Sequence, residues 1–277
     1  MTENDVNYSL GKHQERLIPE VFLCKRVEGG LIYYRPGYPF LGDASEWDAY
    51  KVREDTLVSP RAALCRCPDY RGFFVERQYD QDGVRSGHFK ALCLLHERKY
   101  HKVTFEEVMG LKLHAGGDVG YLYHSYSGGV ELLWADNFPG ELKTNLRRVV
   151  VEGLIELAKN GIDYHDLLPS NLRYDFEGKL VCNPHNCIHI LDRELSLEEQ
   201  MNNLSCLLYT NSWIENPTEF LDAYFRDALS AEEIQRITKR IQQTMTDMDE
   251  LGDIIEVPFH WWPRQNRRIC SIMYASS

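Results

Sequence analysis

This 277-residue chain has no long apolar run and almost no block of basic residues. A membrane-spanning helix needs about 20 mostly apolar residues in a row, so the sequence predicts no transmembrane segment. The formal net charge is −11, and the one short basic stretch is at residues 264–268. Because a net negative charge repels the phosphate backbone, we expect no nucleic-acid partner.

The start of the sequence lacks the apolar core of a signal peptide, because Thr2, Glu3, Asn4 and Asp5 follow the first methionine. This predicts a cytoplasmic protein. Without a secretion signal, the eight cysteines are expected to be reduced thiols rather than a disulfide framework. The composition, 43% hydrophobic and 26% charged, excludes disordered and fibrous classes.

The periodicity of the chain changes near residue 140. Before it, runs rich in β-formers predict strands at residues 31–35, 72–79, 119–124 and 130–134, the last two joined as a hairpin. Helical spacing appears in this half at residues 89–100 and 104–114. From residue 142 apolar residues recur at helical spacing up to Asn160 and Gly161, which are typical of a helix end. The sequence therefore predicts an α+β chain with a β-rich lobe, residues 1–139, and a mainly helical lobe, residues 140–277.

Three polar residues after this helix carry the strongest chemical signal. Asp166 is followed five positions later by Asn171, and Asp192 ends a later β-like run. Between Asn171 and Asp192, residues 175–179 predict a hairpin turn flanked by strands at residues 172–174 and 180–182. A carboxylate can accept the proton of an attacking hydroxyl, and amide and carboxylate oxygens are ligands that Mg²⁺ prefers. The pattern predicts phosphoryl transfer, with Asp166 as the catalytic base and Asn171 and Asp192 as metal ligands.

In residue order this segment resembles the catalytic loop H-R-D-x-x-x-x-N and the metal-binding Asp of protein-kinase-like enzymes. Tyr164, His165 and Asp166 stand where those enzymes carry H-R-D. The resemblance implies a two-lobed protein-kinase-like fold, ATP and Mg²⁺ as cofactors, and a hydroxyl-bearing acceptor. One departure is Leu168, where protein kinases place a lysine.

Two parts of the first half resemble the phosphate-binding elements of the same enzymes. Residues 40–52 are similar to a degenerate glycine-rich loop in which Gly42 remains; an ordinary β-hairpin is the alternative. The position of the phosphate-binding lysine holds Arg66, which keeps the charge but has a different shape. Lys51 is the other candidate for that role.

A glutamate on a following helix holds the phosphate-binding cation in protein kinases. The segment at residues 104–114 is the predicted helix, with Thr104 as its N-cap and Glu107 completing a capping box. Glu106 is therefore the candidate for the ion pair, and a solvated helix face is the alternative.

The segment after Asp192 departs from protein kinases. It runs at once into a capped helix that begins near Ser196, and no A-P-E follows. Here the chain resembles small bacterial lipopolysaccharide-core and sugar kinases and, more loosely, aminoglycoside phosphotransferases. The resemblance implies phosphorylation of a hydroxyl on a sugar or small molecule. An atypical protein Ser/Thr kinase and an inactive pseudokinase that serves as a binding or regulatory module stay open as alternatives.

A zinc site is a further alternative in the same region. Cys182, His185, Cys187 and His189 fall within eight residues and include the C-x-x-H spacing of zinc sites. A closed structural site needs four ligands that converge on one point, whereas Pro184 and two neighbouring Asn residues favour a plain turn.

Overall fold

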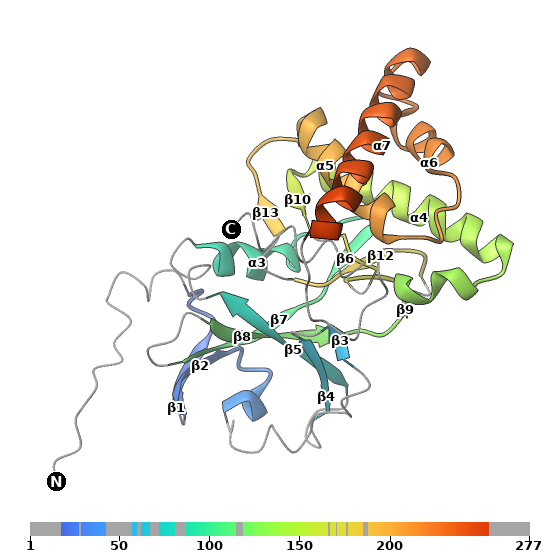
Figure 1. Cartoon of the computed structure of the whole chain (residues 1–277). Coiled ribbons are helices and arrows are strands. Elements are labelled where there is room, and N and C mark those ends of the chain that lie inside the picture. The colour runs from blue at the N-terminus through green and yellow to red at the C-terminus, as the bar shows by residue number, and fades with distance from the viewer. Residues whose placement is uncertain are drawn as a thin grey trace, which may run out of the picture. The chain divides into compact units, whose positions relative to one another are not determined.

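The computed structural model describes residues 18–27, 29–42, 57–59, 62–66, 72–80, 87–114, 119–165, 167–169, 171–175, 177–184 and 188–254 (Figure 1). The chain divides into two units. Unit 1 contains residues 1–99, 105–128 and 183–186, and unit 2 contains residues 100–104, 129–182 and 187–277. Strands dominate the N-terminal part and helices the C-terminal part, so the predicted α+β class is confirmed.

Unit 1 is built on a seven-stranded antiparallel sheet with the order β1-β2-β7-β8-β5-β4-β3. One helix, α3 (His88–Leu95), lies between β5 and β7 in the sequence, and a short 3-10 helix, η1 (Pro39–Gly42), follows β2. The strands are β1 (Leu23–Val27), β2 (Gly30–Tyr34), β3 (Leu57–Ser59), β4 (Ala62–Arg66), β5 (Phe73–Asp80), β7 (Val108–His114) and β8 (Val119–Tyr126).

Burial in this sheet follows the position of each strand. The edge strand β1 is mostly exposed, whereas β8, flanked by β5 and β7, buries Leu122, Tyr123 and His124 in succession. A strand inside a sheet has both edges paired, whereas an edge strand leaves one edge open. The main buried cluster contains Ile32, Leu41, Cys65, Phe74, Met109 and Tyr123.

The helix predicted at residues 104–114 is wrong. The segment forms β6 (Val103–Phe105), a break at Glu106 and Glu107, and then β7. β7 lies between β2 and β8 and pairs with both. The physical reason is long-range pairing, which buries the apolar side chains of β7 and outweighs the helix propensity of its Met, Leu and Lys residues.

The hairpin predicted from residues 119–134 is also wrong. β8 pairs with β5 and β7, whereas β9 (Val130–Glu131) pairs with β11 in a different sheet. The glycines between the two runs have positive φ, 88° at Gly128 and 95° at Gly129. These glycines separate β8 and β9, which belong to different sheets and do not pair with each other.

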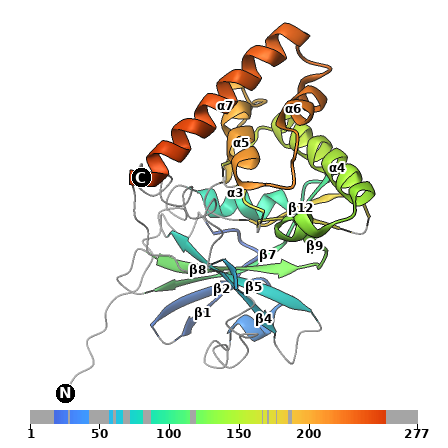
Figure 2. The same cartoon turned by 45° about the vertical axis from the view of Figure 1, so that its right-hand side comes forward.

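Unit 2 contains the predicted long helix, α4 (Gly140–Lys159), followed by α5 (Leu197–Thr210), α6 (Pro217–Phe225) and α7 (Ala231–Ile254). α7 packs against α5 and α6 (Figure 2). The capping box expected near Ser196 is confirmed, because Ser196 Oγ accepts from Glu199 N and the Glu199 carboxylate accepts from Ser196 N.

Short strands connect these helices and form two small sheets. β6-β12-β11-β9 is one sheet, and β10 (Ile162–Tyr164) pairs with β13 (Ile188–Ile190) in the other. β11 (Leu172–Tyr174) and β12 (Leu180–Cys182) form the predicted hairpin, whose turn is held by Asp175 Oδ1 accepting from the backbone N–H groups of Glu177 and Lys179.

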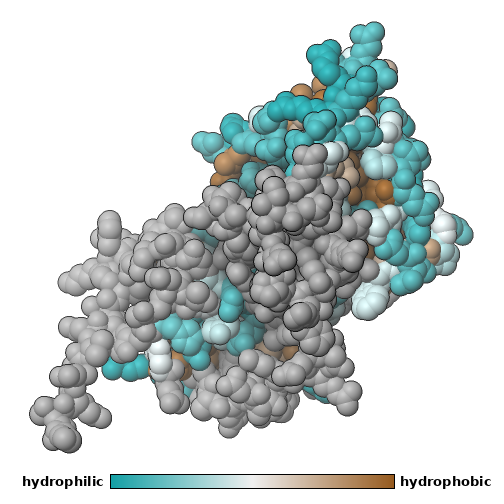
Figure 3. Space-filling model, viewed as in Figure 1, coloured by the Kyte–Doolittle hydropathy of each residue, from teal (hydrophilic) through white to brown (hydrophobic). Residues whose placement is uncertain are grey.

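The surface drawn over α6 and α7 is mostly hydrophilic in the view of Figure 3. In the part of the chain that the structure describes, no helix combines the length and the apolar character needed to cross a membrane.

A small cavity in unit 2 lies next to a buried amide oxygen. It has about 10 Å³ of room for the centre of a water molecule and is lined by residues of α4, β10, α5 and α6, including Asn203 and Leu204. The Oδ1 atom of Asn203 is buried and accepts no hydrogen bond from any described residue. Burying a polar atom without a partner costs free energy.

We therefore expect Asn203→Leu to raise the free energy of unfolding by about 1 kcal/mol, because it removes the buried oxygen and adds apolar contacts. The measurement is chemical denaturation of the full chain. Asn202→Leu is the matched control, because Asn202 is exposed on the same helix. This substitution gains the same helix propensity and leaves the core unchanged. Equal effects of the two substitutions would contradict the expectation.

Candidate functional site

The proposed catalytic base follows directly on the α4–β10 unit. α4 ends at Lys159, Gly161 turns the chain with φ 68°, and β10 runs to Tyr164. Asp166 itself lies outside the described residues. Its neighbours are described: His165 is half-buried, and Leu167 and Leu168 are buried.

Asn171 lies at the other end of the same loop. Its side chain is 1% exposed, its N–H donates to the Leu168 carbonyl at 2.9 Å, and β11 begins at the next residue. The Tyr164 hydroxyl donates to the Asn171 carbonyl oxygen at 3.4 Å. One backbone hydrogen bond and one from the Tyr164 hydroxyl therefore hold the end of this loop where β11 begins.

Asp192 follows β13, and its side chain is exposed. The antiparallel register pairs Ile162 with Ile190 and Tyr164 with Ile188. β13 therefore ends, and the chain continues to Asp192, at the end of the ladder where β10 begins. β10 ends, and the chain continues toward Asp166, at the opposite end of the ladder. Two hydrogen bonds hold the segment after β13 against the end of α4: Leu191 N to Gly161 O at 2.8 Å, and Leu195 N to Ala158 O at 2.9 Å.

The register of β10 with β13 affects the metal site proposed for Asn171 and Asp192. Within the described residues no group of three His, Cys, Asp or Glu side chains could hold a metal ion. Mg²⁺ demands nearly octahedral oxygen coordination, and Asn171 and Asp192 are the proposed protein ligands. A shared site stays a proposal that requires the segment after Ile190 to approach the loop after Tyr164. The chemistry proposed for this chain therefore rests on Asp166.

A carboxylate and two imidazoles lie together on the β10–β13 ladder. His165 Nε2 is 2.6 Å from Asp163 Oδ2, and the rings of His165 and His189 are edge to face with centroids 5.0 Å apart. The hydrogen bond with Asp163 raises the pKa of His165, although burial opposes it. Burial lowers the pKa of His189, and the nearby His165 lowers it further.

Two of the three phosphate-loop candidates of the first half, Gly42 and Arg66, lie in described segments. Gly42 ends η1, so the strand expected there is wrong, and Lys51 lies outside the described residues. Arg66 ends β4 with an exposed side chain, and its guanidinium carbon is 6.0 Å from the centroid of the Phe73 ring. A role of these three residues in phosphate binding remains a proposal.

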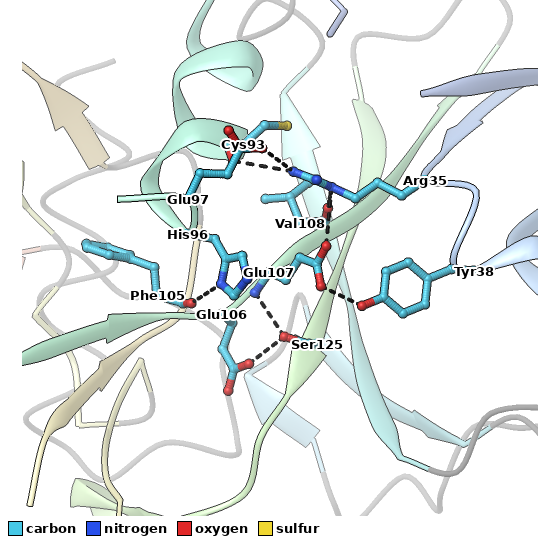
Figure 4. Close-up of polar contacts among 10 residues, drawn as sticks. All are labelled: Arg35, Tyr38, Cys93, His96, Glu97, Phe105, Glu106, Glu107, Val108 and Ser125. Carbon is cyan, nitrogen blue, oxygen red and sulfur yellow. Dashed lines mark hydrogen bonds and ion pairs between the residues drawn. The ribbon is translucent and has the colours of Figure 1, made fainter. Parts of the chain in front are cut away.

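Glu106 lies in the break between β6 and β7 rather than on a helix, and its side chain is 3% exposed. Its carboxylate accepts from Ser125 Oγ at 2.6 Å, from Ser127 N at 2.9 Å and from Ser127 Oγ at 2.8 Å (Figure 4 draws the Ser125 bond). These three hydrogen bonds satisfy the buried carboxylate and connect the end of β8 and the residue after it to the break before β7.

Its neighbour Glu107 belongs to a second network, also drawn in Figure 4. The Glu107 carboxylate accepts from the Tyr38 hydroxyl at 2.5 Å and forms an ion pair with Arg35 at 3.5 Å. Arg35 also donates to the Val108 carbonyl at 2.9 Å and forms an ion pair with Glu97, just past α3, at 3.3 Å. This arginine therefore connects the end of α3 to β7.

One cation that the sequence reasoning missed lies on β5. Arg77 is 6% exposed in the middle of this strand, between Ala62 of β4 and Leu122 of β8. A charged side chain is rarely this buried unless it is paired or binds an ion of opposite charge. Arg77 is therefore a further candidate for phosphate binding. The signal in the sequence was a cation inside a predicted strand, residues 72–79.

The described residues contain no group of side chains that could form the zinc site considered above. His185 and Cys187 lie outside the described residues. Cys182 is fully buried, and burial raises the pKa of its thiol, which disfavours the thiolate that a metal requires.

Comparisons with known proteins leave the family open. No family model and no curated protein matches this chain. Among solved structures it is similar to the Cydia pomonella granulovirus kinase PK-1, with a TM-score of 0.43 and 13% identity, over 87% of this chain and 94% of that one. It is also similar to a chain of the yeast RNA polymerase II CTD kinase CTDK-1 complex, with a TM-score of 0.40 and 13% identity, over 62% of this chain and 69% of that one. Likeness at this level assigns neither an activity nor a partner to the chain.

Proposed function

We propose that this chain is an ATP-dependent phosphotransferase that acts on a hydroxyl of a sugar or small molecule, with a protein-kinase-like fold whose lobes are residues 1–139 and 140–277. The observation that carries the proposal is the loop between β10 and β11. It carries Asp166 and Asn171 five residues apart, and both flanks of Asp166 are held: His165 by Asp163, and Leu167 by residues of α5 and its C-terminal end. A carboxylate that is held close to a hydroxyl can act as a general base, and this is the role proposed for Asp166.

In the proposed reaction, the acceptor hydroxyl oxygen forms a bond to the γ-phosphorus of ATP while its proton passes to Asp166. The bond between the γ-phosphorus and the bridging oxygen breaks, and ADP leaves with the electron pair. Mg²⁺ neutralises charge on the phosphates in this class of reaction, and Asn171 and Asp192 are its proposed ligands. Arg66, Lys51 and Arg77 are the proposed phosphate-binding cations, and Glu106 and Gly42 belong to the same proposed ATP site.

A binding module without catalysis is the second candidate. The position of Asp192 favours it, because the register directs this residue away from the end of β10 that leads to Asp166. Such a module would bind a nucleotide or a partner and transfer no phosphate.

The test is to measure ATP binding by calorimetry, with and without Mg²⁺, and then to follow ³²P transfer from γ-labelled ATP to sugars, aminoglycosides and protein substrates. The proposal predicts Mg²⁺-dependent ATP binding and label in a small-molecule acceptor. Binding without transfer would select the binding module, and label in protein would select an atypical protein kinase. Absence of ATP binding would end both kinase proposals.

A further inference from the structure

Asp163 is a buried carboxylate in unit 2. Its side chain is 7% exposed, and its Oδ1 atom is buried without a hydrogen-bond donor among the described residues. Its Oδ2 atom pairs with His165 Nε2 at 2.6 Å. A buried carboxylate is costly unless a charge or a donor compensates it. His165 therefore supplies the only hydrogen-bonded counter-charge that the described residues offer to Asp163.

The pairing follows from the strand geometry. Side chains two residues apart in a strand point to the same face, so Asp163 and His165 share one face of β10. His189 is the cross-strand partner of Asp163, which brings its ring to the same face. Arg193, in the segment after β13, and Glu199, on α5, also act electrostatically on this group: Glu199 raises the pKa of His165, and Arg193 forms an ion pair with Glu199 at 2.7 Å.

The residues on both sides of Asp166 are anchored. Before it, His165 is held by Asp163. After it, the carbonyl oxygen of Leu167 accepts from Asn211 Nδ2 at 3.3 Å and from Thr210 Oγ1 at 3.4 Å, and the side chain of Leu167 is fully buried. The backbone dihedrals next to Asp166 are therefore constrained from both sides, and only the first anchor contains a group that titrates near neutral pH.

We infer that His165 is a positioning residue for the loop between β10 and β11: its ring pairs with Asp163 and fixes the backbone that leads into the loop, immediately before the proposed base Asp166. The inference rests on the proposed function for its catalytic consequence. The ordering of the loop is a separate consequence, which holds whether or not phosphate is transferred.

The direction of the pH dependence follows from the pair. Because the pKa of His165 is raised in the folded chain, the stabilising charge is fully present below the ordinary histidine pKa of about 6.5 and is lost as pH rises through the raised value. His189 is neutral in that window, because its pKa is lowered. Neutral His165 can still donate from Nε2, but a charge-assisted hydrogen bond is about twice as strong as a neutral one.

The experiment compares the full chain with His165→Gln and His165→Arg across pH 5.5–9. We expect the turnover number of the unmodified chain to fall about 5-fold as His165 loses its proton, with the KM for ATP unchanged. His165→Gln should be slow at every pH, and His165→Arg, which keeps its charge, should lose the fall at high pH. His101→Gln, a change at an exposed histidine of the same unit, should retain the original profile.

A second measurement does not depend on activity. Amide hydrogen exchange of Leu167 and Leu168, corrected for intrinsic rates, should be slowest at low pH and in His165→Arg, and faster at every pH in His165→Gln. NMR titration should show the pKa of His165 falling in Asp163→Asn. If wild-type and His165→Gln amides exchange alike, the inference is overturned. If exchange responds as expected but no acceptor is phosphorylated, the proposed function fails and the structural role of the pair stands.

Discussion

Asp166→Asn is expected to lower the turnover number by about 10²–10⁴-fold, the range that general base catalysis contributes. The substitution keeps the size of the side chain and removes its ability to accept a proton. ATP binding should be unchanged, because the proposed role of Asp166 is in the transfer of the hydroxyl proton and not in holding phosphates.

The measurement combines steady-state turnover on the best acceptor with calorimetric ATP binding for each variant. Asp222→Asn is the matched control: it neutralises an exposed carboxylate on α6 that pairs with Arg226 at 3.1 Å, so both turnover and binding should stay at the original values. Full turnover in Asp166→Asn would remove the base from the mechanism. Loss of ATP binding together with turnover would instead mean that Asp166 acts on the nucleotide or on the fold.

The parts of the fold that were predicted from the sequence are the ones whose signals are local. The capping box of Ser196 and Glu199 lies within one helical turn, and Asn160 and Gly161 end α4 where the helical period stops. The β11–β12 hairpin was predicted from the turn residues around Asp175. In each case the residues that determine the element are neighbours in the chain, so short-range pattern is sufficient.

The failures concern partners that lie far away in the sequence. Residues 108–114 contain good helix formers, but β2, more than 70 residues earlier in the chain, pairs with them and makes a strand. β9 follows β8 closely, yet its partner is β11. Propensity is a weak prior, and tertiary pairing overrides it.

The candidate site divides in the same way. The order of Asp166, Asn171 and Asp192 was visible in the sequence, and so was the strand before Asp192. The direction in which Asp192 leaves that strand is set by the antiparallel register with β10, which no local pattern encodes. The ion pair of Asp163 with His165 was equally within reach, because alternate residues of a strand share a face.

Gly161→Ala is expected to lower the free energy of unfolding by about 2–4 kcal/mol. Its φ of 68° is in the left-handed region, which costs about 1 kcal/mol for alanine. A Cβ there would also clash with the carbonyl oxygens of Arg193 and Leu191, the latter at 2.6 Å. Both are backbone atoms, so relief requires the whole segment after β13 to move, and strain of this kind adds to the cost.

Gly178→Ala separates the two contributions. Its φ is 84°, and a Cβ would meet nothing within 4 Å, so we expect a loss of about 1 kcal/mol from conformation alone. Denaturant unfolding of both variants measures the difference, and equal losses would show that the segment after β13 moves without a cost in free energy.

Because Leu191 and Arg193 flank Asp192, the same pair of variants also tests the metal proposal. If Asp192 binds the metal of an ATP complex, Gly161→Ala should weaken Mg²⁺-dependent ATP binding while Gly178→Ala leaves it intact; equal binding in both would remove Asp192 from that site.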